Sequence, residues 1–240
     1  MNVAVLVDII KETKSNWRFI FESPLYDNIN FIPGQLVQLL AKPYAPSEGG
    51  ESIQRNYSVA SWPDGSNKFE LIITYLKDGK MSEYLFNEVK VGDEFAYKGP
   101  MGIFTLPKTI DRDVFFVSTG SGVSPFRSML GWIAVNKIPT KNIKLFFGTR
   151  TEKDIPYYDE MKMYEEIIPN FEFIPTLSRE VKRGFAEGYV HDHYLPLIDA
   201  SKDKPWVYFC GWDRMVSEGR FHLDERGFEM MKDIRVEIFG

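Results

Sequence analysis

The segment 118–125 reads Ser-Thr-Gly-Ser-Gly-Val-Ser-Pro and directly follows an apolar run at 114–117. This order predicts a buried strand, a glycine-rich turn and a helix, a junction whose free backbone N–H groups suit a diphosphate. Gly120 and Gly122 can take positive φ and let a ligand approach the backbone closely, and Pro125 fits the first helical turn. Because the spacing is G-x-G-x-x-P and not G-x-G-x-x-G, an ordinary strand-to-helix turn remains open.

A second candidate group, Arg55-Asn56-Tyr57-Ser58, opens a predicted strand. The Arg55 guanidinium can bind a phosphate through a forked pair of hydrogen bonds. Tyr57 lies two residues further on, so it shares a strand face with Arg55 and could stack on a planar ring. Ser58 then points to the other face or lies at an edge, where its hydroxyl could bond a ring nitrogen. A surface Arg-x-Tyr strand pair is the alternative interpretation.

A third group, Gly79-Lys80-Met81-Ser82, precedes a predicted helix over 82–87. Glycine in the turn and Ser82 as the helix cap would make a second phosphate cradle at a helix N-terminus. A plain N-cap explains the same residues. The glycine-rich turn at 99–104, Gly-Pro-Met-Gly-Ile-Phe, is interpreted as structural.

The elements that position these motifs come from two regions of the chain with different sequence patterns. Before residue 107, short strands at 3–10, 17–22, 35–40, 57–60, 69–75 and 94–99 alternate with Gly, Pro and Asp turns, which is typical of an antiparallel barrel or sandwich. After it, strands at 114–117, 143–147, 171–176 and 206–210 alternate with helices at 125–136, 157–167, 188–196 and 212–229, which predicts a parallel sheet. We therefore expect domains at 1–107 and 108–240, with a polar loop at 44–52.

Composition limits the possible functions. The 240 residues carry a net charge of −5, which gives no basis for nucleic-acid binding. The single cysteine, Cys210, excludes a disulfide within the chain and an all-cysteine iron–sulfur cluster. Three scattered histidines give no metal-binding spacing. The sequence has neither a signal-peptide pattern at its start nor an apolar run long enough for a membrane span, so a cytoplasmic location is expected.

In this order the motifs resemble the ferredoxin–NADP reductase family of flavoenzymes. Its R-x-Y-S motif is similar to 55–58, its G-x-x-S element to 79–82 and its G-P-x-G-x-F turn to 99–104. The nucleotide motif G-T-G-x-x-P is similar to 120–125, with Ser121 in place of Thr, and C-G-x-x-x-M is similar to 210–215. The resemblance implies a flavin-binding antiparallel six-stranded barrel followed by an α/β nucleotide-binding domain.

The resemblance also implies a role for each motif residue. Arg55 would pair with the flavin phosphates, Tyr57 would lie on the isoalloxazine, and Ser58 would bond near its N5 atom. The remaining residues expected around the flavin and the nucleotide are Val59, Thr74, Gly79, Met81, Ser82, Thr119, Gly120, Gly122, Pro125, Gly211 and Met215. Cys210 would flank the nicotinamide, although a small buried apolar residue is the alternative. Phe239 would cover the flavin face or pack in the barrel seam. Tyr57, Ser58, Cys210 and Phe239 form the expected catalytic set.

The expected reaction is hydride transfer from NADPH or NADH to FAD, followed by single-electron transfer to a separate ferredoxin or flavodoxin, as in the enzyme class EC 1.18.1. Ser178-Arg179, with Arg150, Lys182 and Arg183 nearby, favours NADPH because such a cluster suits a 2′-phosphate. FAD is preferred to FMN because the loop before Arg55 could cover an adenosine. A reductase of free flavin or another small molecule, and a non-catalytic flavin- or nucleotide-binding subunit, are the alternatives.

Overall fold

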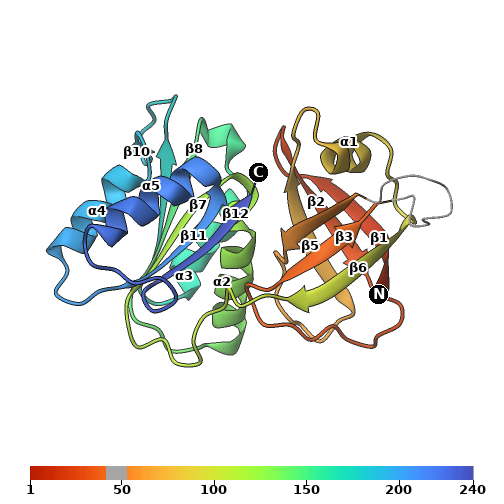
Figure 1. The fold of residues 1–240 in the computed structure, drawn as a ribbon, viewed down its shortest axis with the longest axis horizontal. Helices are drawn as coiled ribbons and strands as arrows, with labels where there is room; N and C mark the ends of the chain where they lie inside the picture. Colours follow the sequence, from red (N-terminus) through yellow and green to blue (C-terminus); the bar gives the residue numbers. More distant parts are fainter. Residues whose placement is uncertain (42–52, 240) are drawn as a thin grey trace.

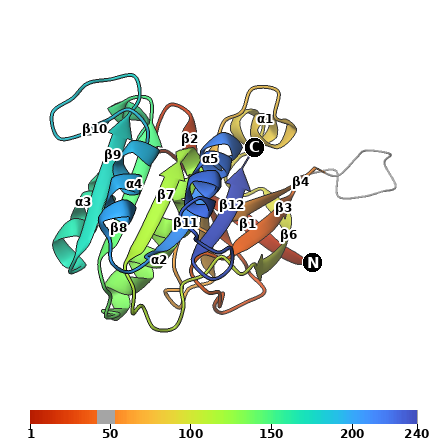
Figure 2. The same cartoon turned by 60° about the vertical axis from the view of Figure 1, so that its left-hand side comes forward.

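The computed structural model describes residues 1–41 and 53–239, so the polar loop expected at 44–52 lies outside the described residues. Two domains lie side by side, each built on one sheet of six strands (Figure 1). The N-terminal domain contains the antiparallel sheet and the C-terminal domain the parallel one, with helices on both of its faces (Figure 2). The predicted fold class is confirmed.

The first sheet has the order β4-β3-β6-β1-β2-β5 and is antiparallel throughout. The gap between its edge strands is bridged where the Ala60 N–H donates to the Glu70 carbonyl oxygen at 2.8 Å. All six strands face one apolar core. The strands are β1 (Asn2–Lys11), β2 (Asn16–Glu22), β3 (Leu36–Leu40), β4 (Gln54–Ser58), β5 (Lys68–Thr74) and β6 (Glu94–Met101), and the helix α1 is Lys80–Asn87.

The fourth strand starts and ends earlier than the predicted range 57–60. Pairing with β3 begins at Gln54 and ends at Ser58, so Arg55 and Tyr57 both lie within the ladder. Val59 then turns away and is fully buried in the barrel core. Val59 and Ala60 are apolar, as strand residues often are, so the sequence pattern extended the predicted strand beyond Ser58, where pairing with β3 ends.

The second sheet has the order β10-β9-β8-β7-β11-β12 and is parallel throughout. Its strands are β7 (Val114–Thr119), β8 (Ile143–Thr149), β9 (Phe171–Leu177), β10 (Ala186–Glu187), β11 (Trp206–Trp212) and β12 (Ile234–Phe239). Its helices are α2 (Ser124–Asn136), α3 (Tyr158–Ile167), α4 (His191–Ala200) and α5 (Asp213–Asp224), with short 3₁₀ turns η2 (Gly120–Val123) and η3 (Glu152–Asp154).

The C-terminal strand β12 was not predicted, because the helical pattern was extended to 229. The helix α5 in fact ends at Asp224, and the chain turns at Gly227, where φ is +70°. The chain then returns as β12 beside β11, in a register that pairs Cys210 with Glu237 and Trp212 with Phe239. This strand therefore brings the C-terminus to the centre of the molecule (Figure 1).

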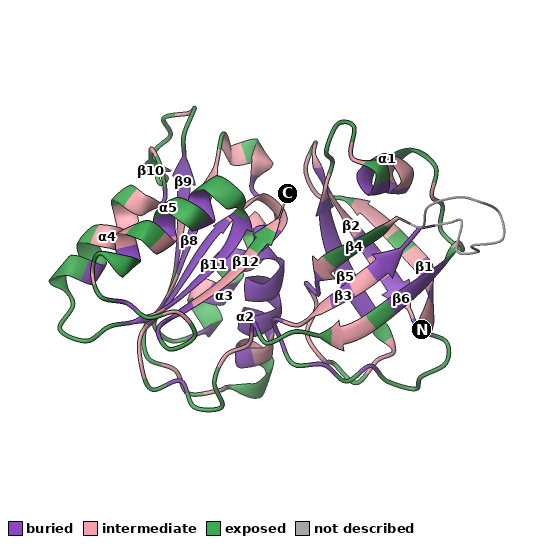
Figure 3. Cartoon of the chain, viewed as in Figure 1, coloured by how far each residue is buried: buried purple, intermediate pink, exposed green. Residues whose placement is uncertain are grey.

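The domains meet through β5 and α2, and this contact positions the site. Side chains alternate along β5, so Phe69 lies in the barrel core while Ile72 packs into the core of the second domain. Helix α2 is buried along most of its length (Figure 3). The Trp62 ring lies against Gly131 of α2, where a Cβ atom would be 2.0 Å from it.

Candidate functional site

A cavity of about 250 Å³ lies at the junction of the two domains. Its lining includes seven residues of the first domain that the sequence singled out: Arg55, Tyr57, Ser58, Thr74, Gly79, Met81 and Ser82. The second domain contributes Thr119, Gly211 and Phe239 from the same set. Residues that lie far apart in the sequence therefore line one cavity. Burial raises the pKa of the Tyr57 phenol, so this ring stays neutral.

The N-terminus of α1 forms one end of this cavity, but Ser82 is not its cap. The N-cap residue is Gly79, and the Ser82 hydroxyl instead accepts a hydrogen bond from the Leu76 N–H at 3.1 Å. A Cβ atom at Gly79 would lie 2.8 Å from that hydroxyl oxygen. The first intrahelical bond runs from the Glu83 N–H to the Gly79 oxygen at 2.8 Å, so the preceding N–H groups suit an external acceptor.

These residues fit the phosphates and the ring of a flavin nucleotide. The helix end supplies backbone donors and partial positive charge. Arg55 adds an exposed guanidinium on the cavity wall, and Tyr57 adds an aromatic face. The combination of a cation, a helix N-terminus and an aromatic ring in one cavity can bind a group that is anionic at one end and planar at the other.

A carboxyl group that the sequence reasoning missed, Glu237, links the second domain to Ser58 on the cavity wall of the first. The Ser58 hydroxyl donates to its Oε2 atom at 2.6 Å, and the Cys210 Sγ atom lies 3.9 Å from the same oxygen. Burial raises the pKa of Glu237 to about 7. Burial also raises the pKa of the Cys210 thiol, which favours its protonated form. The motifs carried no signal for Glu237, because β12 itself was not predicted.

The raised pKa of Glu237 predicts how stability depends on pH. The folded protein keeps this carboxyl protonated up to about pH 7, whereas the unfolded chain ionises it near its ordinary value of 4.5. Its contribution to stability is therefore complete below that ordinary value and is lost as pH rises through the folded pKa. Glu237→Gln should flatten the decline of the melting temperature across this window, and the exposed Glu88→Gln should leave it unchanged. An equal decline in both variants would contradict this assignment.

The glycine-rich turn after β7 has the predicted strand–turn–helix form, and Pro125 lies in the first turn of α2. Gly120 has a φ of +57°, as expected. Gly122, however, is not in the positive-φ region, so a positive φ is not the reason for glycine at this position. A Cβ at Gly122 would lie 2.1 Å from the Cys210 carbonyl oxygen, so it is the end of β11 that needs the space.

A larger cavity of about 1080 Å³ continues from the first across the second domain. Of the predicted residues it is lined by Thr74, Thr119, Gly120, Arg150, Ser178 and Met215. Two backbone bonds join its rim loops: the Ser178 N–H donates to the Thr149 oxygen at 2.9 Å, and the Arg179 N–H to the Arg150 oxygen at 3.0 Å. Lys182 forms an ion pair with Glu152, so its charge is already compensated.

Five predicted residues lie outside both linings. Val59 lies in the barrel core, and Pro125 is buried in α2. Cys210 is buried, with its Sγ atom 3.9 Å from the Glu237 carboxyl, and Gly122 lies against β11. Arg179 is exposed on the rim.

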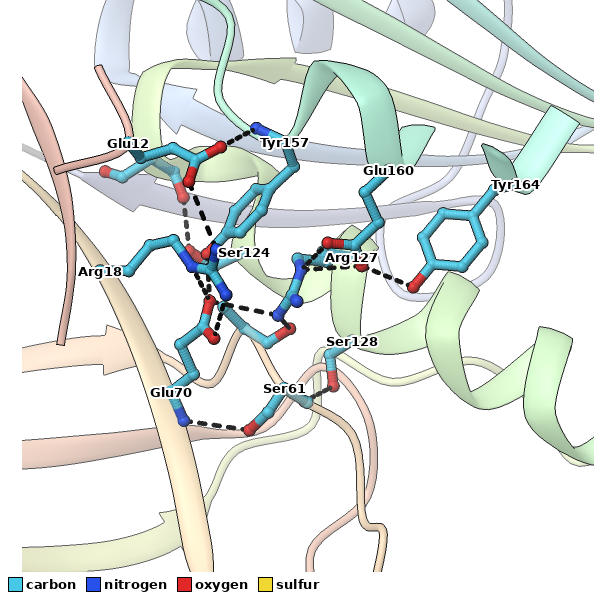
Figure 4. A network of polar contacts seen from close by, with 12 residues as sticks. Glu12, Arg18, Ser61, Glu70, Ser124, Arg127, Ser128, Tyr157, Glu160 and Tyr164 are labelled. Carbon is cyan, nitrogen blue, oxygen red and sulfur yellow. Dashed lines mark hydrogen bonds and ion pairs between the residues drawn. The ribbon is translucent and has the colours of Figure 1, made fainter. Parts of the chain in front are cut away.

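A buried ionic network holds the two domains together beside the cavities (Figure 4). The carboxylate of Glu70, on β5, accepts a forked pair of hydrogen bonds from Arg18 at 2.9 and 2.8 Å. From the second domain it accepts bonds from Arg127 at 3.2 Å and from the Tyr157 hydroxyl at 2.5 Å. Burial alone would raise the pKa of Glu70, but the Arg18 bonds and the Arg127 charge outweigh it and hold the pKa below its ordinary value.

Arg127 in turn connects three segments. Its Nε atom donates to both oxygens of Glu160 at 3.0 and 2.9 Å, and its Nη1 atom donates to the Ala60 carbonyl at 3.0 Å. Arg127 lies on α2 directly after the glycine-rich turn, and Glu70 lies four residues before Thr74 on β5. The network therefore fixes the turn of one domain relative to the cavity wall of the other.

Two domain models match the chain: an oxidoreductase FAD-binding domain at residues 4–106 and an oxidoreductase NAD-binding domain at 116–220. The ferredoxin–NADP reductase B of Sorangium cellulosum is 38% identical over 193 residues, which cover 78% of this chain and 76% of that protein. The anthranilate 1,2-dioxygenase electron transfer component of Acinetobacter baylyi is 30% identical over 82% of this chain. This chain spans only 55% of the length of that second relative.

Solved structures share the fold at low sequence identity. The cytochrome P450 reductase of Amycolatopsis superposes with a TM-score of 0.86 at 22% identity, covering 99% of this chain and 69% of that one. The ferredoxin NADP⁺ reductase of Neisseria gonorrhoeae, solved with FAD and NADP, gives 0.79 at 21% identity, covering 98% and 97%. In the described part of this chain, no helix has the length and apolar character needed to cross a bilayer.

Proposed function

Because the chain belongs to the ferredoxin–NADP reductase-like family of FAD- and NAD(P)-binding oxidoreductases, we propose that it oxidises NADPH or NADH at a bound FAD and passes the electrons singly to a separate carrier protein. One observation carries the proposal: Tyr57 and Ser58 of the first domain and Phe239 of the second line one cavity, and the Ser58 hydroxyl donates a 2.6 Å hydrogen bond to Glu237 of the second domain.

The chain's own residues would bind and orient both nucleotides. Arg55 and the N-terminus of α1 would hold the FAD phosphates, and Tyr57 would lie against the flavin ring. When bound, FAD supplies the redox chemistry, since it accepts two electrons together and can release them one at a time. The Ser58 hydroxyl, fixed by its hydrogen bond to Glu237, would point its oxygen atom at the flavin ring. Catalysis then depends on alignment, which the domain junction provides.

An anaerobic titration tests this function. The purified protein should be yellow, and its flavin absorbance should bleach when NADPH or NADH is added. A protein that stays colourless after incubation with FAD would instead support the non-catalytic subunit. Bleaching without transfer to any one-electron carrier, together with rapid turnover on free flavin, would favour the small-molecule reductase.

The choice between the nucleotides is expected to depend on the rim of the larger cavity. We propose NADPH as the donor. Arg150 and Arg179 lie on two loops that are joined by backbone hydrogen bonds, and their guanidinium groups would contact a 2′-phosphate. Arg179→Ala should raise the KM for NADPH roughly tenfold, the effect of losing one charge-assisted contact, with little change for NADH. Lys182→Ala is the matched control, since that lysine is already paired with Glu152. Equal losses for both nucleotides would exclude a 2′-phosphate contact.

The acceptor and the setting are also proposals. The similarity to a ferredoxin–NADP reductase supports a ferredoxin or flavodoxin and an EC 1.18.1 activity, whereas the dioxygenase component supports an oxygenase partner. Residue 107 is proposed as the domain boundary, because β6 ends at Met101 and β7 begins at Val114. The cytoplasmic setting is supported by the lone cysteine.

A further inference from the structure

Trp212 stands where the two cavities join. Four residues line both cavities, namely Thr74, Leu76, Thr119 and Trp212, and Trp212 is the aromatic one among them. Its indole Nε1 would lie 3.5 Å from a Cβ at Gly120, and the Thr74 hydroxyl would lie 3.8 Å from the same point. The ring therefore lies beside the glycine-rich turn, opposite the end of β5.

The position of Trp212 departs from the residue types that its local structure favours. Trp212 is the N-cap residue of α5, where Ser, Thr, Asp or Asn is preferred, and its side chain makes no capping bond. Its backbone is held in place, because its N–H donates to the Thr119 hydroxyl at 3.2 Å. Yet 43% of this large ring remains exposed. Trp212 therefore neither caps its helix nor is buried in a core, and the exposed part of its ring is available to a ligand where the two cavities join.

The proposed function requires the nucleotide to pass this point. Its diphosphate would lie at the Gly120 turn, whereas its nicotinamide must reach the flavin ring beside Tyr57 and Phe239. The connecting part must cross between Trp212 and Thr74, since both residues line both cavities. A planar, partly exposed indole at this passage offers a stacking face.

We propose that Trp212 is a positioning residue that stacks against the nicotinamide end of the pyridine nucleotide as this end enters the flavin cavity. This inference rests on the proposed function, and it adds a role for the residue that follows Cys210-Gly211. The adenosine end, which would lie towards Arg150 and Ser178, should not contact the indole.

The test measures equilibrium binding of oxidised NADP⁺ and NAD⁺ to the FAD-loaded protein. Trp212→Ala should weaken the binding of whichever dinucleotide the unchanged protein prefers by about two- to tenfold, the range for an aromatic contact. Trp212→Phe should recover most of this loss. Adenosine 2′,5′-bisphosphate, which lacks the nicotinamide, should bind all variants equally. The flavin absorbance of each variant shows that FAD is retained.

Tryptophan fluorescence gives a second readout. The chain has five tryptophans, so the signal of Trp212 is the difference between the unchanged protein and Trp212→Phe. NADP⁺ should quench this difference, and adenosine 2′,5′-bisphosphate should not. The control Trp206→Phe, whose residue contacts Arg112 and lines neither cavity, should keep the full quenching.

Different results would overturn different statements. Unchanged NADP⁺ and NAD⁺ affinity in Trp212→Ala, or equal losses for the dinucleotide and the adenosine fragment, would refute the stacking role while leaving the reductase intact. If the unchanged protein bound neither dinucleotide, the proposed function would fail and the inference with it.

Discussion

Glu70→Gln is expected to lower the free energy of unfolding by about 3–5 kcal/mol, the usual loss when one partner of a buried ion pair is removed. Glu70 is 7% exposed and accepts bonds from Arg18, Arg127 and Tyr157. The neutral amide would leave two guanidinium groups partly uncompensated at the domain interface. Because Arg127 and Tyr157 belong to the second domain, we expect the two domains of this variant to unfold in separate transitions.

Chemical denaturation followed by both far-UV circular dichroism and flavin fluorescence would measure this effect. Glu172→Gln is the matched control, since it removes a strand carboxylate that is paired with Lys144 at the surface. Such exposed pairs contribute about 0–1 kcal/mol. Tyr157→Phe removes one hydrogen bond without changing any charge, so its loss in free energy of unfolding should lie between those of Glu70→Gln and Glu172→Gln. A Glu70→Gln protein as stable as the control would show that the network does not hold the domains together.

Gly122→Ala is expected to reduce pyridine-nucleotide affinity at least tenfold while FAD stays bound. The added Cβ would lie 2.1 Å from the carbonyl oxygen of Cys210 and 2.9 Å from the Cα of Gly211. These are backbone atoms, so the glycine-rich turn and the end of β11 must move apart. Strain of this kind costs about 1–3 kcal/mol, and it would fall on the elements that we propose align the nicotinamide.

The readouts for Gly122→Ala are the flavin spectrum and a titration with NADP⁺ and NAD⁺. Gly92→Ala provides a matched control, because Gly92 has a φ of +99° but nothing within 4 Å of its would-be Cβ. That control pays a local conformational cost of about 1–2 kcal/mol and should keep its nucleotide affinity. Normal nucleotide binding by Gly122→Ala would mean that the turn adapts without loss.

The fold class could be predicted from the sequence because it depends on local patterns. Short strands separated by Gly, Pro and Asp turns predicted the antiparallel domain, and strand–helix alternation predicted the parallel one. The glycine at 120 was correctly expected to have positive φ. The ends of elements were less accurate, as for β4, because burial of Val59 and Ala60 resembles strand burial.

The sequence alone determined the two architectures, the strand–turn–helix form of the glycine-rich turn and the family resemblance, since each is carried by neighbouring residues. Only the tertiary structure placed Glu237 beside Ser58, 179 positions away, and joined Glu70 to Arg127. It also showed that glycine is needed at position 122 because the backbone of β11 leaves no space for a Cβ atom there. These contacts depend on how two domains pack, and packing is set by shape and charge complementarity between distant segments, which no local pattern records.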